Sequence, residues 1–269
     1  MKNYLLIILF CLLSTAKLPA TAQFPDYLIY QGDTLMLFSN PLEPFFEKRN
    51  SREIPNFGGC HTTASWRGYI AWWELRNDSL FLLKIAGCSF NEETDEQADL
   101  HLLFPERETE KNIFADWLDG LIFNPYGERL HYEHMGYASI YQYERVFTFQ
   151  KGILKKIKVH QNKVLKSPLS DNTDSLLHFL FQNIHWNELP ELQEGAQAKV
   201  LVQFKTDQNG HIQLPKIVRS SGQVYETETL RLLKQLAFWN TYVRRGEVLD
   251  YTWTLPINFD PAFYRKKLE

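Results

Sequence analysis

Three features are scarce in this sequence, and each scarcity excludes a class of protein. The apolar run Leu5–Leu13 has nine residues, whereas a membrane-spanning helix needs about 20. Charge is nearly balanced, with 29 basic and 32 acidic residues and a formal net charge of −3. That balance argues against nucleic acid or an anionic membrane surface as the partner. The twelve prolines are scattered singly, so no Pro-rich spacer is present.

Motifs of common catalytic sites are also missing. The sequence contains no Gly-x-Ser-x-Gly, no His-Glu-x-x-His and no phosphate-binding glycine loop. Two sites remain open as alternatives. One is a nucleophilic Cys60 beside His61, which would need a lowered pKa and a positioned base. The other is a zinc site that adds His131 and His134 to the cysteines, although on a strand these histidines point to opposite faces. We predict no catalytic residues, no metal and no cofactor.

The N-terminus is typical of a secretory signal. Lys2 precedes the apolar run, and Ala20-Thr21-Ala22 supplies a small-x-small cleavage pattern. Residues 1–22 are therefore predicted to be a cleaved signal peptide, which would leave a periplasmic mature chain with no membrane span; an uncleaved anchor is the alternative. Of the three cysteines, Cys11 lies in this segment, and Cys60 and Cys88 are expected to form a disulfide, with a buried, unpaired couple as the alternative.

Length and composition predict two domains. The chain has 269 residues, of which 44% are hydrophobic and 14% aromatic, enough for two sizeable cores. We expect an α+β protein: a β-rich sandwich or barrel-like domain of unknown role, followed by a β-β-α-β domain. The predicted boundaries are a β-rich domain at 23–160, a polar linker at 161–173, the second domain at 174–260 and a tail at 261–269.

The first domain is predicted mainly from turns. Asn77-Asp78 joins two strands, as does Lys151-Gly152, and another turn is expected at 124–127 (Asn-Pro-Tyr-Gly). The acidic stretch Asn91–Glu110 lacks a calcium-loop motif and is predicted to be a solvated loop. A cluster of aromatic residues with an arginine suits either a sugar- or peptide-binding platform or a β core, which we favour for at least half of it: Trp66, Arg67, Tyr69, Trp72 and Trp73.

The second domain has the clearer pattern. Val200, Val202 and Phe204 alternate with polar residues, as in a half-buried strand, and Asn209-Gly210 suits a tight turn. Leucines then recur at helical spacing over residues 230–236. The last strand places five apolar residues on one face: Tyr251, Trp253, Leu255, Ile257 and Phe259.

These residues resemble the C-terminal domain of TonB-type energy transducers. The resemblance covers residues 174–260 and rests on an ordered set of pieces: Val200–Phe204, Asn209-Gly210, Ile217–Gly222, Trp239, Gly246 before the final strand, and Pro256–Phe259. It departs from the family after Trp239, where Asn240-Thr241 stands in place of proline, and in having no anchor or long spacer. The resemblance implies the recognition domain of a transducer and brings no catalytic residues.

Pro256 indicates where a partner would bind. Proline cannot donate a hydrogen bond to a ladder, so the last strand is expected at a sheet edge, and an edge can accept an extended peptide as an extra strand. By resemblance, the residues that would pair with a segment of a TonB-dependent receptor are Tyr251, Thr252, Trp253, Thr254 and Leu255. We therefore predict a non-catalytic envelope protein that binds protein partners. The alternatives are an envelope enzyme with the Cys/His site, and a structural assembly module whose edge is covered.

Overall fold

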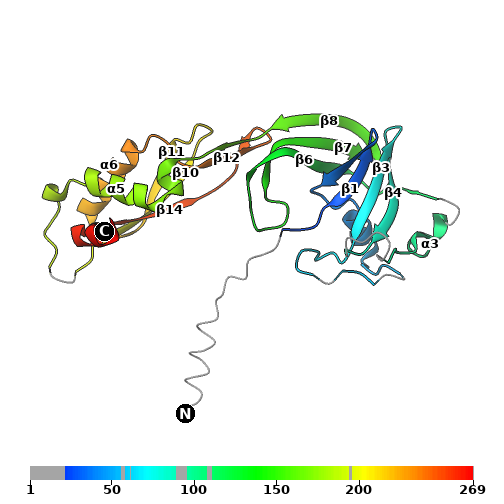
Figure 1. Cartoon of the computed structure of the whole chain (residues 1–269), viewed down its shortest axis with the longest axis horizontal. Coiled ribbons are helices and arrows are strands. Elements are labelled where there is room, and N and C mark those ends of the chain that lie inside the picture. Colours follow the sequence, from blue (N-terminus) through cyan, green and yellow to red (C-terminus); the bar gives the residue numbers. More distant parts are fainter. Residues whose placement is uncertain are drawn as a thin grey trace, which may run out of the picture. The chain divides into compact units, whose positions relative to one another are not determined.

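The computed structural model describes residues 22–55, 58–60, 62–88, 96–107, 111–193 and 196–268. Two compact units make up the chain, Met1–Val159 and His160–Glu269 (Figure 1). The predicted signal peptide lies outside the described residues except for Ala22, as do His61 and parts of the acidic stretch. Across the described ranges, no helix has the length and apolarity needed to cross a membrane.

The N-terminal unit is built on one eight-stranded sheet. Its strand order is β2-β1-β3-β4-β8-β7-β6, and β5 pairs with β4 outside this path. The strands are β1 (Asp26–Tyr30), β2 (Asp33–Leu37), β3 (Ile70–Arg76), β4 (Ser79–Ala86), β5 (Ile113–Phe114), β6 (Gly120–His131), β7 (Ile140–Gln150) and β8 (Ile153–Gln161). Short helical segments connect them: α2 (Glu43–Arg49), α3 (Leu100–Leu103) and η1 (Pro105–Arg107).

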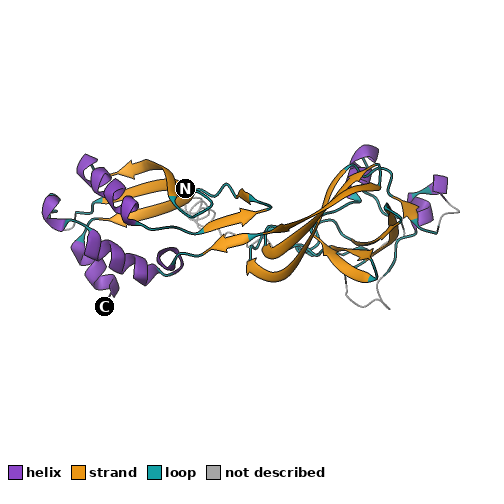
Figure 2. Cartoon of the chain, turned by 90° about the horizontal axis from the view of Figure 1, so that it is seen from above, coloured by secondary structure: helices purple, strands orange, loops and turns teal. Residues whose placement is uncertain are grey.

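This sheet curls until its two ends meet, as the wrapped strands in Figure 2 show. The backbone N–H of Phe38, just after β2, donates to the carbonyl of Phe123 in β6 at 2.8 Å. The side-chain amide of Asn124 donates to the carbonyl of Met36 at 3.0 Å. Together with the fold of the C-terminal unit, this closure confirms the predicted α+β class with a barrel-like first domain.

Turn residues set the hairpins as predicted, with one exception. Asn77 and Asp78 both have positive φ, 49° and 58°, which suits a two-residue turn between antiparallel strands. The turn expected at 124–127 is wrong, because β6 runs unbroken through it. Gly127, at φ 80°, lies where the register of β6 against β7 shifts, so the turn-forming residues make a bulge inside one strand.

A buried ion pair lies in the N-terminal unit and connects β1 to the segment before β3. The guanidinium of Arg67 lies 2.8 Å from the carboxylate of Asp26, and both side chains are almost fully buried. Asp26 also accepts hydrogen bonds from the backbone of Ala71 and the indole of Trp73. Burial raises the pKa of Asp26, and Arg67 opposes that shift. Of the predicted aromatic cluster, Trp73 and Tyr69 lie in the core, while Trp66 is 54% exposed.

The C-terminal unit has a three-stranded sheet in the order β11-β10-β14 and a small sheet in the order β13-β12-β9. The helices α5, α6 and α7 pack on the face of the larger sheet that carries Val200, Val202 and Phe204. The strands are β9 (Lys163–Leu165), β10 (Lys199–Thr206), β11 (Ile212–Ser220), β12 (Thr241–Arg244), β13 (Glu247–Val248) and β14 (Trp253–Asn258). The helical segments are α4 (Pro168–Asp171), α5 (Thr173–Asn183), η2 (Trp186–Glu188), α6 (Gln223–Gln235) and α7 (Pro261–Leu268).

The predicted β-β-α-β order is present as β10, β11, α6 and β14, with additions the sequence pattern did not reveal. Residues 161–173, predicted as a linker, contain β9 and α4, and β9 pairs with β12. Gly246 was expected to introduce the final strand, which is wrong: it lies in the turn between β12 and β13. Strands of two to four residues are too short to show a period, so their pairing is visible only in three dimensions.

Candidate partner-binding site

Strand β14 lies at one edge of the larger C-terminal sheet. It pairs antiparallel with β10, with Val200 opposite Ile257 and Gln203 opposite Thr254. Among the described strands, none pairs with its other side. The strand alternates in burial, since Leu255 and Ile257 face the helices while Thr254 and Pro256 are exposed. This position explains how Pro256 is accommodated, because its missing N–H lies at an edge.

The hydrogen-bond register tells which backbone groups point outward. The N–H of Phe259 donates to the carbonyl of Ala198 at 2.8 Å, and bonded and non-bonded pairs alternate along an antiparallel ladder. Val200–Ile257 and Val202–Leu255 are therefore bonded pairs, and Gln203–Thr254 is a non-bonded pair. It follows that the N–H and C=O of Thr254 and the C=O of Pro256 point away from β10, toward the open edge.

An apolar groove runs beside this edge. Its volume is about 590 Å³, and its walls come from β14, α5 and α7. The residues that line it include Leu176, Leu177, Leu180, Leu255, Ile257 and Phe263, with Asp174, Lys199 and Lys267 as its charged groups. An extended chain laid along β14 would present alternate side chains to this groove, because successive side chains of a strand point to opposite faces.

Helix α7 forms one wall of the groove and closes one end of the edge. Asp260 begins the helix by accepting a hydrogen bond from the N–H of Ala262 at 2.9 Å, and Pro261 follows at the first helical position. The hydroxyl of Tyr264 donates to the carbonyl of Asn258 at 2.7 Å. Burial raises the pKa of that hydroxyl. The outward carbonyl of Asn258 is thus occupied, and the open edge ends near Pro256.

Helix α5, the second wall, is held by a polar network from α6. The carboxylate of Glu228 accepts the N–H of His185 at 2.8 Å and two bonds from Arg231 at 2.7 Å. Arg231 also donates to the carbonyl of Asn183, at the end of α5. Desolvation tends to raise the pKa of Glu228, but these hydrogen bonds and the charge of Arg231 outweigh it, so the pKa is lowered.

The five residues predicted to bind a partner fall in different environments. Tyr251 and Thr252 precede β14, and Trp253 begins it. Tyr251 is 39% exposed and stacks on Trp253, with ring centroids 5.5 Å apart. Thr254 is exposed on the edge, whereas Leu255 is only 4% exposed and lies in the core. The exposed hydroxyl of Thr254 accepts a hydrogen bond from Gln203 at 3.3 Å, while Leu255 supports the strand from beneath.

The sequence interpretation missed the groove because it treated residues 261–269 as a tail. The signal was present: Asp260-Pro261 is a strong helix start, and Arg265, Lys266 and Lys267 suit a last helical turn. Leu176 and Leu177 of the lead-in helix also line the groove. Sequence alone gave no reason to place them beside β14.

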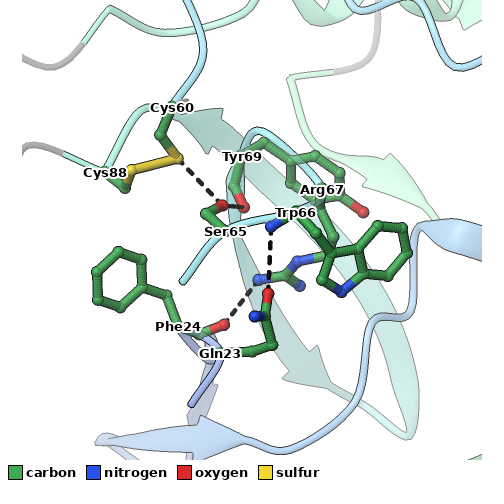
Figure 3. The surroundings of a disulfide bond; sticks show 8 residues. All are labelled: Gln23, Phe24, Cys60, Ser65, Trp66, Arg67, Tyr69 and Cys88. Carbon is green, nitrogen blue, oxygen red and sulfur yellow. Dashed lines mark hydrogen bonds between the residues drawn. A yellow bond between two sulfur atoms is a disulfide. The ribbon is translucent and has the colours of Figure 1, made fainter. Parts of the chain in front are cut away.

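Of the alternative Cys/His site in the N-terminal unit, the structure describes Cys60, Cys88, His131 and His134. Cys60 and Cys88 are joined by their sulfur atoms, with Cα atoms 5.4 Å apart (Figure 3). The hydroxyl of Ser65 lies 3.1 Å from the Cys60 sulfur. His131 lies 3.6 Å from a carboxylate oxygen of Glu133, and His134 contacts the hydroxyl of Tyr132. Within the described ranges, no three His, Cys, Asp or Glu residues are grouped to hold a metal ion.

Comparison with known proteins assigns the C-terminal part of the chain. No curated protein and no solved structure matches the chain. One protein-family model does match, and its span contains β10, β11, α6 and β14. Residues 191–261 match the model described as Gram-negative bacterial TonB protein C-terminal, which confirms the resemblance of this part of the chain to TonB-type C-terminal domains.

Proposed function

We propose that this chain is a periplasmic protein whose C-terminal domain captures protein partners by adding an extended segment to β14. The TonB C-terminal family is a non-enzymatic domain that interacts with proteins of the cell envelope. The observation that carries the proposal is the outward N–H and C=O of Thr254, which directly precedes the part of β14 that lines the apolar groove. Main-chain hydrogen bonds would supply affinity and the groove would select side chains. A TonB-dependent receptor is the partner that the family implies.

The geometry limits how such a segment would pair. Pro256 offers a carbonyl but no N–H, and Tyr264 already occupies the carbonyl of Asn258. By the same register the N–H of Asn258 also points outward, so an added strand would find donors at Thr254 and Asn258 and acceptors at Thr254 and Pro256. This short stretch suits a reversible interaction better than a long permanent pairing, because few ladder bonds would form.

The test uses two substitutions at one position. Thr254→Pro removes the outward N–H while sparing the β10–β14 ladder, because residue 254 lies in a non-bonded pair. Thr254→Val keeps the N–H and changes only the side chain. We expect Thr254→Val to retain partner binding and Thr254→Pro to lose it, with the C-terminal fold checked by circular dichroism.

Photo-crosslinking provides the identity of the partner. A photoreactive residue at Thr254 should capture an envelope protein in cells, and one at Thr227, which is exposed on α6, should not. Equal binding by the proline and valine variants, or capture confined to the protein's own N-terminal unit, would reject strand addition and favour a covered edge.

A further inference from the structure

The open face of the C-terminal sheet, opposite its helices, has an unusual charge. Its three strands β10, β11 and β14 contain no Asp or Glu, but they contain Lys199, Lys205, Lys216 and Arg219, all exposed. The pairing register places Lys216 opposite Gln203 and Arg219 opposite Leu201, so these cations lie on the face opposite the helices. The face is thus strongly basic in a chain whose formal net charge is −3.

Among the described residues, most of these cations have no acidic partner. Lys205 lies 2.5 Å from a carboxylate oxygen of Asp250. In the part of the chain that the structure describes, no ion pair involves Lys199, Lys216 or Arg219. The Lys205–Asp250 contact shows how a carboxylate from a neighbouring segment sits on this face.

A hollow of about 440 Å³ lies on the same face, next to the binding edge. Lys199, Arg219, Ser221 and Pro256 are among the residues that line it. Lys199 and Pro256 also line the apolar groove, so the hollow and the groove lie on either side of the edge strand. Exposed apolar side chains accompany the cations, since Val218 is 49% and Leu214 79% exposed.

We infer that this basic face is a second contact surface for the partner held at β14, and that it binds acidic side chains of that partner. The inference rests on the proposed function and adds the chemistry of the partner to it. A protein suits the face better than a membrane does, because a concave hollow receives protruding carboxylates while a bilayer presents a flat surface. Charged groups at the rim of an interface act mainly on the association rate and on specificity.

The experiment uses the full chain and a synthetic peptide of alternating valine and glutamate, with a valine–glutamine peptide as its neutral match. Binding is measured by fluorescence anisotropy at low and high salt. Lys216→Glu with Arg219→Glu should weaken binding of the acidic peptide about tenfold and flatten its salt dependence. The control, Lys156→Glu with Lys158→Glu, makes the same charge change on an exposed strand of the N-terminal unit and should have little effect.

The outcomes separate this inference from strand addition. Suppose that Thr254→Pro weakens binding of the acidic peptide, but Lys216→Glu with Arg219→Glu weakens it no more than the control does. The inference is then wrong and strand addition stands. If charge reversal weakens binding while Thr254→Pro has no effect, the basic face binds acidic segments without an added strand. The inference is also overturned if the acidic peptide does not bind, if the neutral peptide binds equally well, or if phosphatidylglycerol vesicles bind through these residues instead.

Discussion

The N-terminal and C-terminal units end their β-sheets in different ways. The N-terminal sheet curls until hydrogen bonds from Phe38 and Asn124 join its two ends. The C-terminal sheet remains flat enough to keep β14 at an edge, where it pairs with β10 alone among the described strands. An open edge invites pairing with another chain, and closure removes that option. The two ends of the first sheet are joined to each other, whereas the second sheet keeps the edge that the proposed function uses.

The two units also differ in what they bury. The N-terminal unit encloses a full ion pair, Asp26–Arg67, together with a disulfide. The core of the C-terminal unit is apolar, and its main ion pair, Glu228–Arg231, is partly exposed on the arginine side. Four predictions test the differences between the two units.

The largest loss of stability is expected from Arg67→Ala. It would leave the carboxylate of Asp26 buried without its charge partner, so the free energy of unfolding should fall by about 3–5 kcal/mol. Urea unfolding followed by hydrogen-exchange mass spectrometry should place the loss in the N-terminal unit. Arg76→Ala, which breaks the exposed pair with Glu74, should cost less than about 1 kcal/mol. Similar losses for the two variants would mean that Arg67 is not a structural ion-pair partner.

The next largest effect is expected from removing the disulfide. Cys60 and Cys88 are separated by 28 positions, and opening a loop of that size costs roughly 3–4 kcal/mol in the chain-entropy model. The variant Cys60→Ser with Cys88→Ser should lose that much stability in the N-terminal unit only. Reductant should bring the unsubstituted protein to the same stability and leave the variant unchanged. Insensitivity of the unsubstituted protein to reductant would argue against the bond.

In the C-terminal unit, substitutions on the two faces of β14 should change the stability of the fold by different amounts. Leu255→Ala opens a cavity beneath the strand and should lower stability by about 2–3 kcal/mol, toward the low end for buried leucines because the groove lies nearby. Thr254→Ala on the exposed face should change it by less than about 0.5 kcal/mol. Thermal unfolding of both variants gives the comparison, and equal effects would contradict the alternation of burial along β14.

The smallest effect concerns Glu228 and depends on pH. Its pKa is lowered in the folded state, so its interactions stabilise the fold above its unfolded pKa, near 4.3, and are lost as pH falls through the folded pKa. Glu228→Gln should cost about 1 kcal/mol at pH 7, and its stability should approach that of the unsubstituted protein as the pH falls through the lowered pKa of Glu228 in the folded state. A difference that persists unchanged in acid would show that packing, not charge, holds α5 to α6.

Much of the fold could be predicted from local sequence. Alternation over Val200–Phe204, the Asn77-Asp78 turn and the leucine spacing of α6 each depend on residues a few positions apart. The candidate edge was also predictable, since Pro256 lacks a donor. The bulge at Gly127 was not, because the same four residues serve as a turn or as a bulge according to whether β7 extends alongside them.

What the sequence determined by itself was the longer strands and helices, the two-part fold class and the resemblance of the C-terminal segment to TonB-type domains, because these follow from residue periodicity and turn chemistry. Tertiary structure alone decided that Arg67 meets Asp26, that α5 and α7 wall a groove beside β14, and that Tyr264 closes one end of the edge. Those contacts join residues from different elements, and no local pattern encodes which elements will lie side by side.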